Sequence, residues 1–335
     1  MLKVVVTGGA GYVGSHACQA LAARRFVPVT VDDLSMGHRE AVQWGPLHVG
    51  NAADEGFLAE VFQEHQPAAV LHFAASTFVG ESVKDPIRYY RNNVGTTLSL
   101  LNVMHRFNVD KFIFSSTCAI YGTPRILPLA EDHPKDPLSP YGSSKLMVEQ
   151  ILDSVDHAFG VRSVALRYFN AAGADPAAAI GEDHEPETHL IPIVLQVALG
   201  QRDALMIFGE DYDTPDGTAI RDYVHVCDLA DAHVRALQWL LDGGHSLRLN
   251  LGVGKGYSVR EVVDLARQVT GHAIPVRVTE RRPGDAQELI AESGMVQQHL
   301  GWKPERSDLR TIIEDAWRWH RRHELALEAA EAAAG

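Results

Sequence analysis

Short, nearly continuous apolar runs alternate with longer segments of helical periodicity through the first half of the chain. Continuous apolar runs are typical of strands that helices cover on both faces of a sheet. We predict such strands at Val4–Thr7, Val27–Val31, Ala69–Phe73, Phe112–Ser115 and Ser163–Arg167. Between them, apolar spacing predicts helices at Gly14–Ala23, Glu55–Gln63, Asn93–Arg106 and Ser143–Phe159. Because strand–helix–strand repeats place their strands in parallel, this pattern predicts an α/β fold with a doubly wound parallel sheet.

The pattern changes after Asn170, where prolines and glycines interrupt the chain and long periodic segments become rarer. We predict a first domain over residues 1–170, joined by returning segments from about 220–255. The remaining residues, mainly 171–330, are predicted to form a smaller C-terminal α/β domain that binds substrate. Residues 324–335 are an Ala/Glu-rich tail, for which we expect a helix end without chemistry.

Composition and charge narrow the class of protein. The 335 residues are 46% hydrophobic and 22% charged, as in an ordinary globular chain. With 30 Lys and Arg against 43 Asp and Glu, the formal net charge of −13 disfavours a nucleic-acid partner. The apolar runs are too short for a membrane span or a signal peptide, and three scattered cysteines predict no disulfide framework. We therefore expect a cytoplasmic protein with no membrane partner.

A glycine-rich turn connects the first predicted strand to the first predicted helix, with the sequence Thr7-Gly8-Gly9-Ala10-Gly11-Tyr12-Val13-Gly14. Glycines in such a turn let the backbone approach a pyrophosphate, and the helix N-terminus offers free N–H groups. Asp32 ends the next strand, where a carboxylate accepts hydrogen bonds from ribose hydroxyls and repels a 2′-phosphate. The arrangement predicts a Rossmann domain that binds NAD rather than NADP.

Tyr141 and Lys145 are four residues apart at the start of a helical segment and therefore share one helix face. A free phenol has a pKa of about 10, so Tyr141 needs nearby positive charge, from Lys145 and a nicotinamide ring, to act as a base. Thr117 ends a run of hydroxyl residues after a predicted strand, which we expect to face the same crevice. We predict Tyr141, Lys145 and Thr117 as the catalytic residues.

These motifs resemble the extended short-chain dehydrogenase/reductase family, and further segments between Leu2 and about His323 are similar to its UDP-glucose 4-epimerases. The similar segments are His72-Phe73-Ala74-Ala75, Val79-Gly80-Glu81-Ser82-Val83, Tyr89-Tyr90-Arg91-Asn92-Asn93, Ser139-Pro140-Tyr141-Gly142, Leu166-Arg167-Tyr168-Phe169-Asn170, Arg221-Asp222-Tyr223-Val224-His225-Val226 and Arg281-Arg282-Pro283-Gly284-Asp285. The resemblance implies an isomerase that holds NAD tightly and inverts C4 of a UDP-hexose. Hydride would leave C4 for the nicotinamide and return to the opposite face of a transient 4-keto sugar.

The resemblance also implies binding residues, position by position. The implied cofactor contacts are Gly8, Gly11, Tyr12, Val13, Gly14, Asp32, Asp33, Asn51, Ala52, Phe73, Ala74, Ala75, Thr77, Asn92, Thr117, Tyr141, Lys145 and Phe169. The implied substrate contacts are Thr117, Tyr141, Asn170, His189, Leu190, Met206, Phe208, Arg221, Arg282, Asp285 and Leu289. The implied partners are a UDP-sugar and a second copy of the chain, in a homodimer formed through the helices at Asn93–Arg106 and Ser143–Phe159.

Four positions depart from the pattern of the family. Asn51 stands where an aspartate usually meets the adenine, and Thr77 replaces a lysine near the cofactor phosphates, so NAD would be held less firmly. His189 replaces an asparagine near the substrate. Leu289 stands where some members carry a tyrosine, which leaves room for a 2-N-acetyl group. UDP-N-acetylglucosamine and UDP-N-acetylgalactosamine are therefore candidate further substrates.

Other functions stay open from the sequence. A 4-epimerase of UDP-xylose/arabinose or UDP-glucuronate would differ in loops around C6, and a non-catalytic NAD-binding regulator would need only the glycine turn. A 4,6-dehydratase is disfavoured because Cys118 and Ala119 follow Thr117 where an Asp-Glu pair is required. His184 and His189 lie among acidic residues, but we interpret this segment as a solvated loop and predict no metal site.

Overall fold

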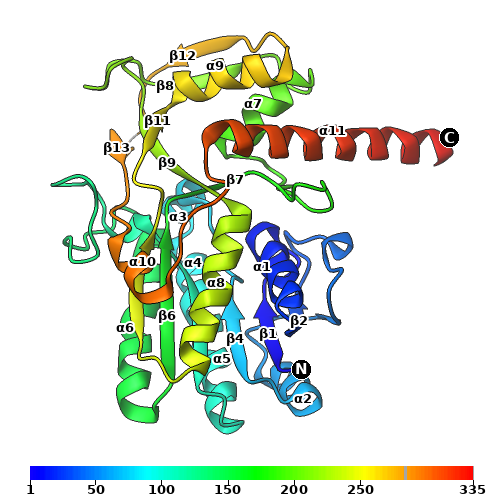
Figure 1. The fold of residues 1–335 in the computed structure, drawn as a ribbon, viewed down its shortest axis with the longest axis vertical. Helices are drawn as coiled ribbons and strands as arrows, with labels where there is room; N and C mark the ends of the chain where they lie inside the picture. The colour runs from blue at the N-terminus through cyan, green and yellow to red at the C-terminus, as the bar shows by residue number, and fades with distance from the viewer. Residues whose placement is uncertain (283–284, 335) are drawn as a thin grey trace.

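The computed structural model describes residues 1–282 and 285–334, so Pro283, Gly284 and Gly335 of the predicted segments lie outside it. Its centre is a seven-stranded parallel sheet in the order β10-β6-β5-β4-β1-β2-β3 (Figure 1). The strands are β1 (Lys3–Thr7), β2 (Val27–Asp32), β3 (Leu47–Val49), β4 (Ala69–His72), β5 (Lys111–Thr117), β6 (Arg162–Tyr168) and β10 (Leu247–Leu251). The strand order reverses between β1 and β4, which opens a binding crevice beyond their carboxyl ends. The predicted doubly wound sheet is confirmed.

Helices cover both faces of this sheet, and each layer buries an apolar cluster of its own (Figure 1). On one face, α1 (Tyr12–Ala23) and α8 (Val226–Leu241) pack against each other and against apolar residues of the strands. The opposite face carries α2 (Glu55–His65), α5 (Thr96–Arg106) and α6 (Pro140–Phe159). Each buried aliphatic side chain contributes roughly 1.5–3 kcal/mol, so these two layers hold the strand ends in fixed positions.

Each strand and helix predicted for the first half is present, with ends shifted by a few residues. The segment before α5 is more broken than predicted, because it contains α3 (Val79–Lys84), α4 (Pro86–Tyr89) and a π-helical turn at Tyr90–Gly95. The short strand β3 and the late strand β10 were not predicted. Short 3₁₀ turns follow β2 and β5, at Arg39–Ala41 and Cys118–Ile120.

The later part of the chain forms a cap beyond the carboxyl edge of the sheet (Figure 1). Its strands are β7 (Asn170–Ala172), β8 (Leu205–Phe208), β9 (Ile220–His225), β11 (Gly256–Ser258), β12 (Val276–Thr279) and β13 (Glu288–Leu289). Its helices are α7 (Leu190–Ala198), α9 (Val259–Thr270) and α11 (Leu309–Ala334). Helix α10 (Gly294–Leu300) instead returns to the seven-stranded sheet, where it packs against β10 and α8. The exact division into two domains stays a prediction. Within the residues described, no helix combines the length and apolarity needed to cross a bilayer.

Candidate active site

The glycine-rich turn between β1 and α1 has no room for side chains. Gly8 has a left-handed φ of 73°, and a Cβ there would lie 2.6 Å from the backbone nitrogen of Ala74. A Cβ on Gly14 would lie 2.1 Å from the carbonyl oxygen of Gly8. Gly11 is the N-cap of α1 and provides no side chain to occupy the first N–H groups of the helix. This cradle fits the pyrophosphate of a dinucleotide.

Asp32 ends β2 beside the glycine turn. One carboxylate oxygen accepts from the backbone N–H of Ala10 at 3.0 Å, and the other accepts from that of Leu34 at 2.9 Å. Burial raises the pKa of Asp32, and these two N–H donors oppose the rise. Each oxygen keeps a lone pair that can accept from a ribose hydroxyl. The geometry fits the predicted role of Asp32 toward NAD.

The other predicted cofactor residues lie along the carboxyl edge of the sheet, but they differ in exposure. Phe73, Ala74 and Ala75 follow β4 directly and lie next to the glycine turn, as the approach of Ala74 to Gly8 shows. Tyr12, Ala52 and Phe169 are buried, and Val13 is half-buried. Asp33, Asn51, Thr77 and Asn92 are exposed. The structure thus brings most of this set to one edge, while the binding role of each residue stays a prediction.

Two of these residues already use their polar groups within the protein. The Tyr12 hydroxyl donates to the carbonyl oxygen of Gly173 at 2.7 Å, which ties α1 to the segment after β7. Asn51 accepts from the backbone N–H of Ala53 at 2.8 Å. Its amide nitrogen remains as a donor, so the predicted contact of Asn51 with an adenine ring would differ from that of an aspartate.

The three predicted catalytic residues converge at the carboxyl end of β5. Thr117 ends this strand, while Tyr141 and Lys145 lie one turn apart at the start of α6. The Lys145 ammonium donates to the carbonyl oxygen of Ser115 at 2.9 Å and lies 6.0 Å from the centre of the Tyr141 ring. The Thr117 oxygen accepts from the backbone N–H of Ala119 at 3.1 Å, which leaves its hydroxyl hydrogen free to donate.

Burial dominates the acidity of the catalytic pair. It raises the pKa of Tyr141, against a smaller opposing effect of the Thr117 hydroxyl. It also lowers the pKa of Lys145 to about 7. We predicted that Lys145 and a nicotinamide ring together lower the pKa of Tyr141. In the protein alone burial outweighs the other influences, so the pKa of Tyr141 is raised. The positive charge of a nicotinamide ring would supply the opposite shift.

Local packing at the start of α6 fixes the position of Tyr141. The Ser139 side chain caps the helix by accepting from the backbone N–H of Gly142 at 3.2 Å, and Pro140 occupies the first turn. A Cβ on Gly142 would lie 2.6 Å from the carbonyl oxygen of Ala119. The first turn of α6 therefore rests directly on the backbone that follows Thr117, which brings the phenol and this hydroxyl together.

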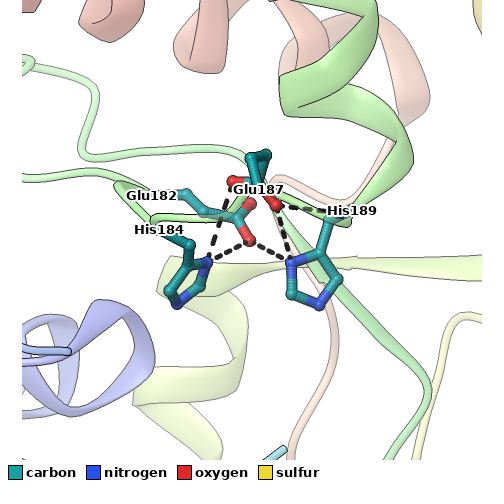
Figure 2. Close-up of side chains that lie close together, drawn as sticks. All are labelled: Glu182, His184, Glu187 and His189. Carbon is teal, nitrogen blue, oxygen red and sulfur yellow. Dashed lines mark hydrogen bonds and ion pairs between the residues drawn. The ribbon is translucent and has the colours of Figure 1, made fainter. Parts of the chain in front are cut away.

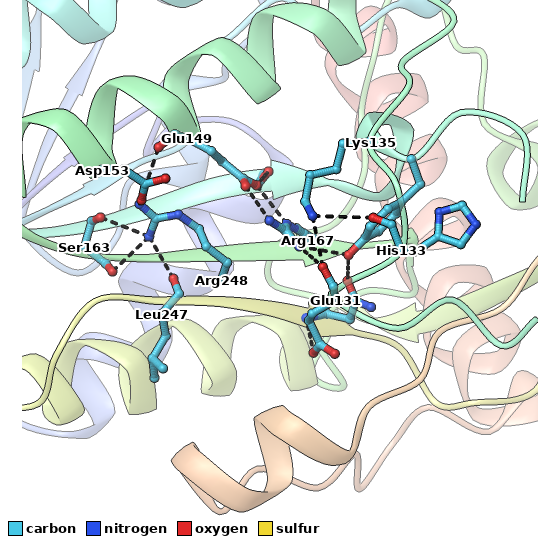
Figure 3. A network of polar contacts seen from close by, with 12 residues as sticks. Glu131, His133, Lys135, Glu149, Asp153, Ser163, Arg167, Leu247 and Arg248 are labelled. Carbon is cyan, nitrogen blue, oxygen red and sulfur yellow. Dashed lines mark hydrogen bonds and ion pairs between the residues drawn. The ribbon is translucent and has the colours of Figure 1, made fainter. Parts of the chain in front are cut away.

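A buried ion pair behind the catalytic residues was not predicted from the sequence. Arg167 of β6 donates to both carboxylate oxygens of Glu149 of α6, at 3.0 and 2.6 Å (Figure 3). Ser116 donates to the same carboxylate at 2.6 Å. The Ser116 bond therefore joins β5 to α6, and the Arg167 bonds join β6 to α6. These contacts lie beside the catalytic residues, because Ser116 precedes Thr117 and Glu149 lies one turn beyond Lys145. Partners from separate elements leave no periodic signal in a sequence, although Arg167 lies in one of the segments similar to the family.

The predicted substrate residues lie mainly in the cap. Arg221 of β9 is in register with Leu289 of β13, and β7, which begins at Asn170, also pairs with β9. Met206 and Phe208 form the exposed face of β8. The Arg282 guanidinium lies 4.5 Å over the Phe208 ring and donates to Asp285 at 3.0 Å. These residues thus form two groups, one on the strands that pair with β9 and one around β8, where Arg282 is already paired.

His189 precedes α7 and Leu190 is its first residue, and the surroundings of His189 differ from the prediction. The His189 Nδ1 atom lies 2.7 Å from a Glu182 oxygen and 3.2 Å from a Glu187 oxygen. Glu182 is 3% exposed and Glu187 is 6% exposed. The prediction of a solvated loop is wrong, because both carboxylates turn into the protein toward the imidazoles.

A glycine cradle joined to a tyrosine, a lysine and a threonine in one crevice is the arrangement of a nicotinamide-dependent enzyme. A sequence model described as "NAD dependent epimerase/dehydratase family" matches residues 4–252. The chain belongs to this family. It is therefore an enzyme, and its cofactor is NAD.

Within the family, the similarity to UDP-glucose 4-epimerases covers nearly the whole chain. The chain is 51% identical over 320 residues to UDP-glucose 4-epimerase of Rhizobium meliloti (strain 1021), with 96% of this chain and 97% of the relative covered. The crystal structure of UDP-glucose 4-epimerase from Brucella ovis in complex with NAD is 48% identical, covers 95% of this chain and 98% of its own, and gives a TM-score of 0.93. The UDP-Glc/GlcNAc 4-epimerase from Campylobacter jejuni is 36% identical with a TM-score of 0.84, covering 96% and 100%. These findings confirm the predicted resemblance.

Proposed function

We propose that this protein interconverts UDP-glucose and UDP-galactose by inverting C4 of the hexose. The observation that carries the proposal is the convergence of Tyr141, Lys145 and Thr117 on a dinucleotide crevice, in a chain about half identical to enzymes of that name. When bound there, NAD supplies the hydride acceptor and donor. The cofactor returns to its starting state in each cycle, so the reaction needs no external reductant.

Tyr141 is the proposed acid and base. Its phenolate takes the proton of the sugar 4-hydroxyl as the C4–H bond breaks, and it returns the proton once the 4-keto sugar has presented its other face. The half-buried position of Tyr141 supports this role, because a proton transfer in a partly dry crevice avoids competition from water. The close packing of Gly142 in α6 against the Ala119 carbonyl supports a fixed position of the phenol.

Thr117 and Lys145 are the proposed supporting groups. The free hydroxyl hydrogen of Thr117 can donate to the sugar oxygen or to the phenolate during proton transfer. Lys145 is buried beside Tyr141, and burial lowers its pKa to about 7, so its charge responds to neighbouring anionic groups. Ammonium donation to the Ser115 carbonyl and to a nicotinamide ribose would orient the cofactor over the same crevice.

The cap offers groups suited to the UDP part of the substrate. Arg221 and Arg282 are guanidinium donors that match a pyrophosphate, and they concentrate positive charge within an acidic protein. The exposed Phe208 ring offers a stacking surface beside Arg282. Asp285 accepts from Arg282 alone among the bonds described for its side chain, so one oxygen remains for a ribose or sugar hydroxyl.

Two alternatives concern the sugar. The half-buried Leu289, in place of a bulkier tyrosine, favours acceptance of UDP-N-acetylglucosamine and UDP-N-acetylgalactosamine, and the Campylobacter jejuni neighbour carries such a dual name. UDP-xylose/arabinose and UDP-glucuronate remain the other candidates. Assays of each UDP-sugar at equal millimolar concentration discriminate these cases. Absence of turnover with the acetylated sugars would reject the broader specificity.

We also propose a homodimer and a cytoplasmic location. Exposed apolar side chains on α5 and α6 support the dimer: Leu98, Met147 and Phe159. The rings of His105 and Phe159 lie 4.5 Å apart, which joins the ends of these two helices into one surface. All three cysteines are free thiols, which supports a reducing compartment.

The decisive experiment is an incubation of the purified protein with UDP-galactose and no added cofactor. The proposal expects UDP-glucose to accumulate to equilibrium, because NAD travels with the protein. If product forms only when NAD is added, the activity stands but tight retention is wrong. If neither condition gives product while the protein contains NAD, the non-catalytic regulator becomes the better interpretation.

A further inference from the structure

Four side chains between β7 and α7 form a compact cluster that takes no part in the proposed proton and hydride transfers. Glu182, His184, Glu187 and His189 each present one potential ligand atom, and these atoms all lie within 4.8 Å of one another. Figure 2 shows the two carboxylates and the two imidazoles turned toward a common centre. We call this group the Glu–His cluster.

The spacing within the Glu–His cluster matches that of metal ligands. Four ligands at about 2.0–2.1 Å from a tetrahedral ion lie about 3.3 Å from one another. The Nδ1 atom of His184 lies 3.3 Å from a Glu182 oxygen and 3.8 Å from a Glu187 oxygen. The Nδ1 atom of His189 lies 2.7 and 3.2 Å from oxygens of the same two carboxylates. Small rotations of the side chains would make these four separations equal.

Burial and hydrogen bonding indicate that the cluster is prepared for a ligand. Glu182 is only 3% exposed, yet its Oε1 atom, which faces both imidazoles, has no hydrogen bond of good geometry among the residues described. The Nδ1 atom of His184 is likewise buried without a well-formed hydrogen bond. Glu187, in contrast, is held in place, since its Oε1 atom accepts from the backbone N–H groups of Thr188 and His189 at 2.7 and 2.8 Å.

We propose that Glu182, His184, Glu187 and His189 bind a divalent transition-metal ion, with Zn²⁺ as the best fit. Two carboxylates neutralise the ion, two neutral imidazoles complete a mixed nitrogen and oxygen set, and four ligands satisfy tetrahedral zinc. From the sequence we predicted no metal site, because we expected the two carboxylates to be solvated. Their burial is the observation that changes this interpretation.

The position of the site indicates a positioning role rather than a catalytic one. The His184 ring lies against Tyr12 of α1, with ring centres 6.3 Å apart, and His189 is the residue before α7. A bound ion would therefore connect the N-terminus of α7 to α1, the helix that faces the dinucleotide. His189 and Leu190 are predicted substrate contacts, so loss of the ion should raise the KM for the UDP-sugar more than it lowers kcat.

The test uses the full-length protein with any histidine tag removed, because a tag binds the same metals. Elemental analysis gives the metal content as purified, and Co²⁺ titration of chelator-treated protein reports binding through its visible absorption. We expect one ion per chain and the absorption pattern of four-coordinate Co²⁺. His184→Gln should weaken Co²⁺ binding by about 100-fold or more, since loss of even an indirect supporting contact costs 10–100-fold.

A matched control comes from the second histidine cluster, formed by His48, Glu64 and His65. His48→Gln should leave Co²⁺ binding unchanged. Far-ultraviolet circular dichroism and NAD content show whether the His184→Gln protein is folded. His189→Asn removes a second ligand and introduces the residue typical of the family at this position. The proposal is overturned if folded wild-type protein binds no Co²⁺, or if binding survives both His184→Gln and His189→Asn. In that case the cluster is a metal-free set of imidazolium–carboxylate pairs.

Discussion

At the residue scale, the chemistry of the site depends on a single phenolic oxygen. Tyr141→Phe removes this oxygen and keeps the ring, so folding and NAD content should stay as in the wild type. Because a positioned acid–base group contributes about 10²–10⁴-fold, kcat with UDP-galactose should fall by roughly that factor. Initial rates normalised to bound NAD measure the effect. Tyr257→Phe, in β11 of the cap, is the matched control, and near-normal turnover of the Tyr141 variant would refute the assigned base.

The buried lysine makes a second prediction at this scale, about stability and pH. The pKa of Lys145 falls from a usual 10.5 to about 7 in the folded protein because of burial. Between these values the unfolded chain binds a proton that the folded chain does not, so raising the pH stabilises the folded state. Below about pH 7 both states carry the proton, and the cost of burying the charge is fully present.

The comparison that isolates this effect is wild type against Lys145→Met, in urea unfolding at several pH values. As the pH rises from about 7 toward 10, the wild type should gain up to about 1.4 kcal/mol per pH unit relative to the variant. Other titrating groups contribute equally to both proteins and cancel in the difference. Parallel stability curves for the two proteins would show that Lys145 keeps an ordinary pKa.

At the element scale, the contact of β5 and β6 with α6 depends on the buried pair of Glu149 and Arg167. Removing one partner leaves an uncompensated buried charge, so Glu149→Gln should lower the free energy of unfolding by about 3–5 kcal/mol. The control lies on the same helix, where Asp153 pairs with Arg248 at 2.6 Å but is 69% exposed (Figure 3). Asp153→Asn should cost less than about 1 kcal/mol. Equal losses in denaturant unfolding would mean that burial does not distinguish the two pairs.

The sequence predicted the strands that are continuous apolar runs and missed two strands that are short or lie in the later half. Strands β1, β2, β4, β5 and β6 are apolar runs bounded by turns, and they were predicted close to their observed ends. Strand β3 has only three residues, Leu47–Val49, which is too short for a pattern. Strand β10 alternates Leu247, Leu249 and Leu251 with polar residues in the later half, where no parallel partner was evident.

The candidate site shows the same limit. The glycine turn, Asp32 and the Tyr141–Lys145 pair follow from short-range spacing, so sequence reasoning placed them on the correct elements. The inward turn of Glu182 and the pairing of Arg167 with Glu149 depend on tertiary contacts, which no local pattern encodes. The raised pKa of Tyr141 depends on how much water the fold removes from the phenol, and no local pattern in the sequence encodes that burial.

At the scale of the whole molecule, the proposed dimer makes a prediction about mass. Leu98 on α5 is 49% exposed, and a charge at a buried dimer interface is strongly unfavourable. Leu98→Glu should therefore convert the dimer into a monomer of half the mass in light scattering coupled to size-exclusion chromatography. Leu325→Glu on α11, a leucine that is 60% exposed, should leave the mass unchanged. A dimer that survives Leu98→Glu would place the interface away from this helix.

The close fit of Gly142 against the Ala119 carbonyl has a consequence for how such an enzyme can diversify. The reacting phenol lies in the first turn of a twenty-residue helix. The backbone of this turn packs directly against the backbone of Ala119. The cap side chains proposed to bind the sugar nucleotide, such as Phe208 and Arg282, are instead partly open to solvent, with exposed fractions of 38% and 58%. Mutations in the cap can therefore change which sugar is accepted while the position of the Tyr141 phenol stays the same.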